Sequence, residues 1–178
     1  MTTWVLFAGP PGTGKSTLAR TMAERLDAAV LDKDRVRGAL FPGPLTDYTA
    51  PQDELCMRAM LDAAAYLTQL RRVDYIFFDG RTFSTRAQVE EVLFAAKRAG
   101  VRWRILHLTC ADAVAEARLA WNDPSHPAQN RDPGLYRRIK QHFEPILEAK
   151  LEVDTTLGTE GQLAAVEAYL RGAESAPR

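Results

Sequence analysis

The chain has 178 residues, with 23 lysines and arginines against 23 aspartates and glutamates, and so a formal net charge of zero. This length suits one domain with a full hydrophobic core, and we expect residues 1–178 to form a single domain. The balanced charge disfavours the globally basic surface that duplex DNA binders present. No stretch approaches the about 18 apolar residues of a membrane-spanning helix, and no signal-peptide pattern is visible, so a cytoplasmic protein is expected.

Strand and helix patterns alternate along the chain, which indicates an α/β fold with a parallel sheet covered by helices. Strands are predicted at residues 3–8, 28–31, 74–79, 104–108 and 151–154, and helices at residues 15–26, 36–41, 53–71, 84–99, 111–121, 135–143 and 162–170. Residues 42–51 are rich in proline and glycine and are expected to form a loop. The polar, proline-rich segment 122–134 also breaks the pattern, and we expect a lid at about residues 121–134.

Residues 9–16 read Gly-Pro-Pro-Gly-Thr-Gly-Lys-Ser, a complete phosphate-binding loop, or Walker A motif, of the form G-x-x-x-x-G-K-[ST]. The loop lies between a strand pattern and a helix pattern, which is the context that this motif requires. Glycine lets backbone N–H groups surround phosphates, Lys15 can reach the β- and γ-phosphates, and Ser16 can hold Mg²⁺. The sequence therefore predicts ATP as the nucleotide and Mg²⁺ as the metal. The predicted nucleotide contacts are Gly9, Gly12, Thr13, Gly14, Lys15, Ser16 and Thr17.

Asp79 ends an apolar strand pattern and is followed by Gly80. In open α/β sheets, ligands lie beyond the carboxyl ends of the strands, so Asp79 is expected beside the phosphate-binding loop. A carboxylate at that place can hold Mg²⁺ directly or through water, so Ser16 and Asp79 are the predicted metal ligands. The alternative is a surface aspartate that only closes the strand.

A charged cluster, Asp32-Lys33-Asp34-Arg35-Val36-Arg37, follows the second predicted strand. A kinase needs a carboxylate beside the acceptor hydroxyl, and a fixed cation commonly holds the acceptor. Asp34 and Arg37 are three residues apart and would share one face of a short helix. The alternative is a solvated helix-capping cluster, with Asp32 or Asp34 as the N-cap.

Two arginines mark the segment between the fifth and sixth predicted helices. Arg118 precedes the polar break and Arg131 lies within it. Arginines carried over the phosphates neutralise charge in the transition state, so both are predicted to be catalytic, together with Lys15 and Asp34. The alternative is a plain surface loop whose arginines form exposed ion pairs.

Three segments resemble the small P-loop kinases: Gly-Pro-Pro-Gly-Thr-Gly-Lys-Ser-Thr, Leu-Asp-Lys-Asp-Arg-Val-Arg and Phe-Phe-Asp-Gly-Arg-Thr-Phe. Within that group the chain is most similar to the 5′-hydroxyl kinase domain of polynucleotide kinases and their stand-alone bacterial relatives, over roughly residues 3 to 150. The resemblance implies a three-layer sandwich with a five-stranded parallel sheet in the order 2-3-1-4-5. It also implies that Asp34 is the general base, that Arg37 grips an acceptor phosphate and that Asp79 is the acidic residue of the third strand.

The sequence departs from this family on the acceptor side. The group often carries two arginines about four residues apart at the entrance to the lid, whereas here Arg118 is followed by Asn122. The loop after the third strand contains Arg81, where the family often has small polar residues, and Arg81 could contact an anionic acceptor. The donor and the type of reaction are therefore more firmly indicated than the acceptor.

These features predict an ATP- and Mg²⁺-dependent kinase that transfers the γ-phosphate to a hydroxyl of a small molecule, such as a metabolite, nucleoside or antibiotic. The balanced charge favours that acceptor class, because oligonucleotide binding draws much of its affinity from basic surface. The first alternative is a polynucleotide 5′-hydroxyl kinase, supported by Asp34 and Arg37. The second, of another class, is a nucleotide-switch ATPase that transfers nothing to an acceptor.

Overall fold

The computed structural model of the protein describes residues 2–121, 132–156 and 158–172. Its strands are β1 (Thr3–Ala8), β2 (Ala28–Asp32), β3 (Tyr75–Asp79), β4 (Arg102–Thr109) and β5 (Leu151–Asp154). Its helices are α1 (Lys15–Arg25), α2 (Lys33–Leu40), the 3₁₀ turn η1 (Gly43–Leu45), α3 (Ala50–Leu70), α4 (Arg86–Arg98), α5 (Asp112–Ala120), α6 (Pro133–Gln141) and α7 (Glu160–Arg171). Among these, no helix has the length and apolar character that crossing a membrane requires.

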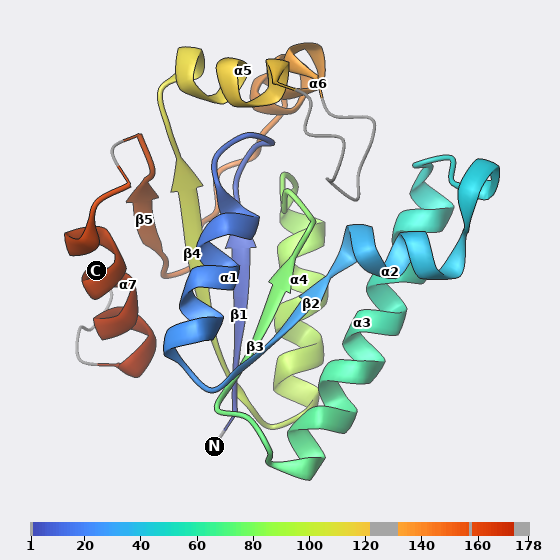
Figure 1. Cartoon of the computed structure of the whole chain (residues 1–178). Helices are drawn as coiled ribbons and strands as arrows, with labels where there is room; N and C mark the ends of the chain where they lie inside the picture. The colour runs from blue at the N-terminus through green and yellow to red at the C-terminus, as the bar shows by residue number, and fades with distance from the viewer. Residues whose placement is uncertain (1, 122–131, 157, 173–178) are drawn as a thin grey trace.

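The five strands form one parallel sheet in the order β2-β3-β1-β4-β5, which confirms the predicted α/β fold and strand order. Helices α1 and α7 cover one face of the sheet, and α3 and α4 cover the other (Figure 1). Helices α5 and α6 lie across the carboxyl ends of the strands, above the phosphate-binding loop (Figure 1). The three-layer arrangement therefore brings the loops that follow the strands to one end of the molecule.

The central strand β1 shows why the sheet needs helices on both faces. Trp4, Leu6 and Ala8 pack against α3 and α4, whereas Val5 and Phe7 pack against α1 and α7. All five side chains are essentially inaccessible to solvent. This continuous apolar run is typical of a parallel strand that is buried on both faces.

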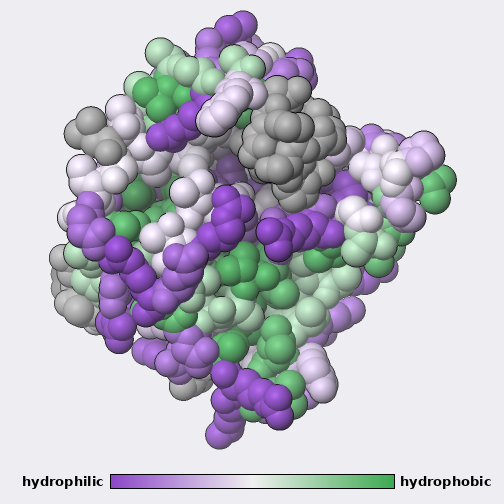
Figure 2. Space-filling model, in the orientation of Figure 1, coloured by the Kyte–Doolittle hydropathy of each residue, from purple (hydrophilic) through white to green (hydrophobic). Residues whose placement is uncertain are grey.

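The sheet is open at strand β2, whose residues are only half-buried. In the space-filling view, hydrophobic side chains gather along this edge, and hydrophilic side chains border the start of α2 just above it (Figure 2). The change from apolar to charged residues at the end of β2 therefore marks the boundary between the sheet and the candidate site.

The structure moves four predicted helix starts towards the N-terminus, by two residues in α6 and α7 and by three in α2 and α3. Helix α2 begins at Lys33 instead of residue 36, because the Asp32 side chain accepts hydrogen bonds from the backbone N–H groups of Asp34 and Arg35 and so caps the first turn. Helix α3 begins at Ala50 instead of residue 53, since Pro51 is tolerated in the first turn of a helix. The predicted loop 42–51 also contains the short turn η1.

Most of the predicted lid, residues 121–134, lies outside the described residues, and so does Arg131. The structure describes its two flanks. Trp121 follows α5 and is largely exposed, and Asp132 caps α6 by accepting a hydrogen bond from the backbone N–H of Leu135. The lid itself therefore remains a prediction.

Candidate active site

Two of the three glycines in the phosphate-binding loop leave no room for a Cβ atom. Gly9 has φ +139° and Gly12 has φ +79°, both in the region that L-residues rarely adopt. A Cβ atom on Gly9 would lie 2.3 Å from the carbonyl oxygen of Leu108, and one on Gly12 would lie 2.8 Å from that of Ala115. These glycines allow the loop to pack against β4 and α5 while its backbone stays open towards a ligand.

Two side chains hold the loop from inside. The Lys15 ammonium donates to the carbonyl oxygens of Gly9 and Pro10, both at 2.8 Å, and is buried. The Thr13 hydroxyl donates to the carbonyl oxygen of Pro10 at 2.8 Å. Thr17, also predicted to contact the nucleotide, is exposed in the first turn of α1. The lysine therefore links backbone carbonyl groups from the start of the loop.

Asp79 lies at the carboxyl end of β3, beneath this loop, and is 2% exposed. Burial raises the pKa of its carboxyl, and a hydrogen bond from the Ser16 hydroxyl partly offsets the shift. Its Oδ1 atom is buried without a hydrogen-bond partner in the part of the chain that the structure describes. A hard oxygen ligand without a partner next to a serine hydroxyl fits Mg²⁺.

Across the described ranges, no group of three or more histidine, cysteine, aspartate or glutamate side chains forms a self-sufficient metal site. A magnesium ion at a nucleotide site usually takes only a few ligands from the protein and the rest from phosphates and water. Ser16 and Asp79 are the residues that would hold it.

The start of α2 separates the two aspartates of the charged cluster. Asp32, which pairs in register with Asp79 across β2 and β3, caps the helix and also contacts Arg35 at 3.6 Å. Asp34 is in the first turn, and its side chain is 15% exposed. Burial raises the pKa of the Asp34 carboxyl above its ordinary value. The capping alternative therefore holds for Asp32, and Asp34 is the carboxylate that reaches the site.

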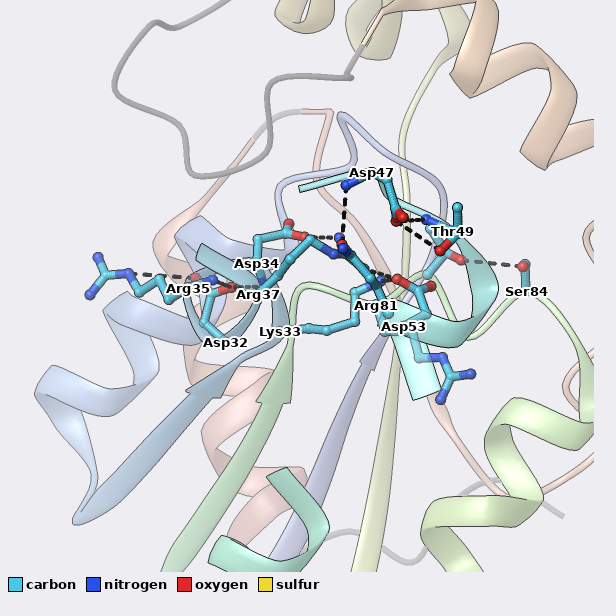
Figure 3. Close-up of polar contacts among 12 residues, drawn as sticks. Asp32, Lys33, Asp34, Arg35, Arg37, Asp47, Thr49, Asp53, Arg81 and Ser84 are labelled. Carbon is cyan, nitrogen blue, oxygen red and sulfur yellow. Dashed lines mark hydrogen bonds and ion pairs between the residues drawn. The ribbon is translucent and has the colours of Figure 1, made fainter. Parts of the chain in front are cut away.

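Arg37 is held between two carboxylates and an aromatic ring. Its Nη1 atom lies 3.4 Å from Asp34 Oδ1, its Nη2 atom pairs with Asp53 Oδ1 of α3, and its guanidinium lies 5.0 Å from the centre of the Tyr48 ring. Figure 3 shows Arg37 lying between Asp34 and Asp53. Lys33, in the same turn of α2, donates to Asp53 Oδ1 at 3.0 Å. Asp53 thus joins the two buried cations of α2 to α3.

A pocket of about 240 Å³ connects the phosphate-binding loop with this cluster. It contains predicted residues from three separate stretches of the chain: Lys15 and Ser16, then Asp34 and Arg37, then Arg81. Arg81 is 8% exposed and its Nη1 atom donates to Glu91 Oε2 of α4 at 2.7 Å. The further lining residues are Pro11, Lys33, Tyr48, Asp53, Gly80, Thr82, Gln88, Leu135 and Ile139.

Arg118 reaches the loop from the last turn of α5. Its Nη1 atom donates to the carbonyl oxygen of Gly12 at 3.2 Å, and its Nη2 atom donates to the carbonyl oxygen of Thr155 at 3.0 Å. The Thr155 hydroxyl donates to the carbonyl oxygen of Thr13 at 2.8 Å. The structure thus places Arg118 beside the phosphate-binding loop, whereas Arg131 lies outside the described residues.

Sequence reasoning assigned no role to three residues that the structure places at the site: Lys33, Asp53 and Thr155. Thr155 directly follows strand β5, so the rule that located Asp79 beyond β3 would have indicated it as well. Lys33 lies inside the charged cluster, but the amino-acid sequence does not show that its side chain is buried. Nothing in the sequence marks Asp53, since an acidic residue in the first turn of a helix is ordinary.

Comparison with known proteins connects this geometry to a family. The model of the AAA domain family AAA_33 matches residues 5–146. The chain is 34% identical over 92 residues to the Holliday junction branch migration complex subunit RuvB of Methanoregula boonei, a segment that makes up 52% of this chain and 22% of that protein. The chain therefore spans less than a quarter of the length of this relative.

Solved structures with the same fold include kinases. A candidate kinase from Chloroflexus aurantiacus aligns with a TM-score of 0.78 and 19% identity, over 98% of this chain and 99% of that chain. The APS kinase CysC of Mycobacterium tuberculosis, in complex with AMPPNP and APS, aligns with a TM-score of 0.67 and 16% identity, over 96% and 98% of the two chains. At these identities the likeness establishes the P-loop kinase fold alone.

Proposed function

The chain belongs to the AAA domain family AAA_33, and from this premise we propose that it is an ATP- and Mg²⁺-dependent kinase whose acceptor is a hydroxyl group of a small molecule. The observation that carries the proposal is that Lys15 and Ser16 of the phosphate-binding loop line the same pocket as Asp34 of α2. A phosphate-binding loop alone serves many nucleotide-dependent proteins. A buried carboxylate across the same pocket is what transfer to a hydroxyl requires.

In the proposed reaction, the acceptor oxygen attacks the γ-phosphorus, and the bond from that phosphorus to the bridging oxygen of ADP breaks. The hydroxyl proton passes to the Asp34 carboxylate, and ADP leaves with the electron pair of the broken bond. Bound Mg²⁺ neutralises charge on the phosphate oxygens. Lys15 and the backbone N–H groups of the loop hold the β- and γ-phosphates, and Ser16 and Asp79 hold the metal.

Arginine supplies further positive charge at the transferring group in this proposal. The contact of Arg118 with the carbonyl oxygen of Gly12 supports this role, because the loop would hold the phosphates. Arg131 keeps its predicted role as a second such cation. Fixed cations at the transferring group are worth most where water is excluded, because charges interact more strongly in a medium of low dielectric constant.

The size of the pocket supports a small acceptor. Its volume of about 240 Å³ lies below the about 300–1,000 Å³ that ligand pockets typically measure. Lys33, Arg37 and Arg81 each already pair with a carboxylate, so the pocket wall carries little unbalanced positive charge. A polynucleotide strand needs a basic surface to compete with its counterions.

A larger groove of about 830 Å³ between α3 and α4 also gives a polynucleotide little support. Three arginines line it, together with three acidic residues. They are Arg58, Arg81 and Arg98 against Glu54, Asp62 and Glu91. A polynucleotide 5′-hydroxyl kinase therefore stays the second candidate, and the spacing of Asp34 and Arg37 is the observation that favours it.

ATP consumption with and without acceptors tests the proposal. The purified protein is incubated with Mg²⁺ and ATP, alone or with nucleosides, hydroxylated antibiotics, sugars or oligonucleotides with a 5′-hydroxyl. We expect slow consumption alone and fast consumption with one small-molecule class. Fast consumption with oligonucleotides would favour the second candidate, and steady hydrolysis that no acceptor changes would favour a nucleotide switch. We also propose that the protein works in the cytoplasm, where ATP is abundant.

A further inference from the structure

We propose that Asp53 is a specificity-determining residue that supplies the acceptor pocket with its own anion, so that the pocket selects a hydroxyl compound without a phosphate or carboxylate group near the reacting hydroxyl. This inference rests on the proposed kinase function, which it deepens by naming the class of acceptor. It assigns Arg37 a different task from the grip on an acceptor phosphate that the family resemblance implies.

The first argument is that the two terminal nitrogens of Arg37 already lie against carboxylates, while its buried Nε atom has no hydrogen-bond partner among the described residues. Arg37 is 2% exposed, with Asp34 at Nη1, Asp53 at Nη2 and the Tyr48 ring beside its guanidinium plane. An arginine grips a phosphate through two parallel N–H donors of its planar fork. Both terminal nitrogens of Arg37 already face carboxylates, so an acceptor phosphate would have to displace one of them.

The second argument is that Lys33, the other buried cation of α2, is committed to the same carboxylate. Its ammonium nitrogen is 3.0 Å from Asp53 Oδ1, and Lys33 as a whole is 7% exposed. Asp53, whose side chain is 30% exposed, is therefore shared by two buried cations and reaches the pocket from α3 (Figure 3). It stands where an anionic group of an acceptor would otherwise balance Lys33 and Arg37.

The third argument is that Arg81, in the segment after β3, is balanced in the same way. Its ion pair with Glu91 of α4 measures 2.7 Å, and Arg81 is 8% exposed. The three acceptor-side cations thus pair with carboxylates supplied by this chain. Breaking a buried pair leaves an uncompensated charge, and this cost opposes the entry of an anionic acceptor.

The same arrangement gives Arg37 a use in the proposed reaction. Because Arg37 is fixed by Asp53, its contact with Asp34 Oδ1 keeps that carboxylate oriented in the first turn of α2. Arg37 is then a positioning residue for Asp34, and Asp53 acts on the acceptor through charge balance. An uncharged acceptor enters without disturbing this network.

Binding of inorganic phosphate, measured by calorimetry, tests the inference without any transfer step. The full chain is first saturated with Mg²⁺ and a non-hydrolysable ATP analogue, so that phosphate cannot enter the donor site. We expect no detectable binding to the wild type. Asp53→Asn frees Lys33 and Arg37, and charge-assisted hydrogen bonds to these cations should raise the affinity for phosphate by about tenfold or more.

Three further variants test whether the gain in phosphate affinity comes from the lost charge of Asp53. Glu54→Gln removes an exposed charge from the next residue of α3 and should show no gain. Asp53→Glu retains the negative charge and should show none either. Adding Arg37→Gln to Asp53→Asn should abolish the gain, because the fork that holds the phosphate is gone. A merely structural role of Asp53 predicts no gain of phosphate affinity in any of its variants.

The inference would be overturned if the wild type binds phosphate and Arg37→Lys weakens that binding. This measurement is decisive even if Asp53→Asn does not fold. A folded Asp53→Asn protein that gains no affinity would overturn it as well. The proposed function fails separately, if no hydroxyl compound is phosphorylated at all. Binding and transfer therefore distinguish a wrong acceptor class from a protein that is not a kinase.

Discussion

The phosphate-binding loop holds its shape through backbone geometry, whereas the acceptor side of the same pocket is held by ion pairs between side chains. Gly9 and Gly12 pack so closely against neighbouring carbonyl groups that a single added carbon atom would clash. On the other side, Lys33 and Arg37 of α2 depend on Asp53, which comes from a different helix. The residues that form the first region are eight consecutive ones, whereas the second region forms only after α2 and α3 pack together.

This contrast separates what the protein shares with other nucleotide-binding chains from what is its own. A backbone cradle recognises phosphate groups, which every nucleoside triphosphate carries. Ion pairs between side chains change with single substitutions, so they are where acceptor choice can vary between chains of one fold. Four predictions sharpen this comparison, from the largest expected effect to the smallest.

Asp34→Asn keeps the shape of the side chain and removes the base, so we expect turnover to fall by roughly 10²–10⁴-fold with nucleotide affinity nearly unchanged. Since burial raises the pKa of Asp34, the wild-type rate should fall on the acid side at a higher pH than for an ordinary carboxyl. Steady-state kinetics and nucleotide calorimetry check both points. Asp32→Asn is the matched control, because asparagine is also a good N-cap, and a larger loss there would contradict the assignment.

Lys15→Ala removes a cation from the donor side, and we expect a loss of roughly 10²–10³-fold in the rate of phosphoryl transfer. Nucleotide affinity should fall too, which separates this variant from Asp34→Asn. Thermal unfolding would verify that the protein is folded. Transfer within about tenfold of the wild type in a folded protein would refute the role of the loop lysine.

Gly9→Ala puts a Cβ atom against the carbonyl oxygen of Leu108 at a residue with φ +139°, so we expect the free energy of unfolding to drop by about 1–3 kcal/mol or more. Nucleotide affinity should drop as well, because the loop must shift. Gly38→Ala is the control: no atom lies within 4 Å of its Cβ, and a helical alanine should stabilise by about 0.5–1 kcal/mol. Urea unfolding of both variants decides the point, and equal effects would be inconsistent with the packed loop.

Lys33 should leave a signature in the pH dependence of stability. Burial lowers its pKa to about 8 from the ordinary 10.5. Between these values the unfolded chain still binds a proton that the folded protein has released, so the free energy of unfolding from this group rises with pH. Lys33→Met should remove the rise, whereas Lys97→Met, at an exposed lysine of α4, should keep it. Identical pH profiles for both variants would count against a buried Lys33.

The sequence was sufficient for the features that depend on local patterns. The apolar run of β1, the glycines of the loop and the position of Asp79 after β3 follow from periodicity, motif and the rule for open sheets. Arg118 was also predicted near the phosphates, and the structure places it at Gly12. The roles assigned to these residues stay predictions until kinetics test them.

Other features depend on contacts between distant residues, and the sequence did not show them. The start of α2 was placed too late because the cap by Asp32 became clear only from its hydrogen bonds to the next turn. Asp53 lies 20 residues after Lys33 along the chain, and their pairing needs the packing of α3 against α2. A burial pattern cannot reveal which cation a given carboxylate balances.

The fate of a labelled γ-phosphate tests the central claim most directly. The protein is given Mg²⁺, ATP labelled at the γ-phosphate and the small hydroxyl compound that the acceptor panel selects, and the products are separated. The account predicts that the label appears on that compound, that little inorganic phosphate forms without it and that Asp34→Asn loses the labelled product. Label released as inorganic phosphate at one rate, with and without every acceptor, would contradict the account.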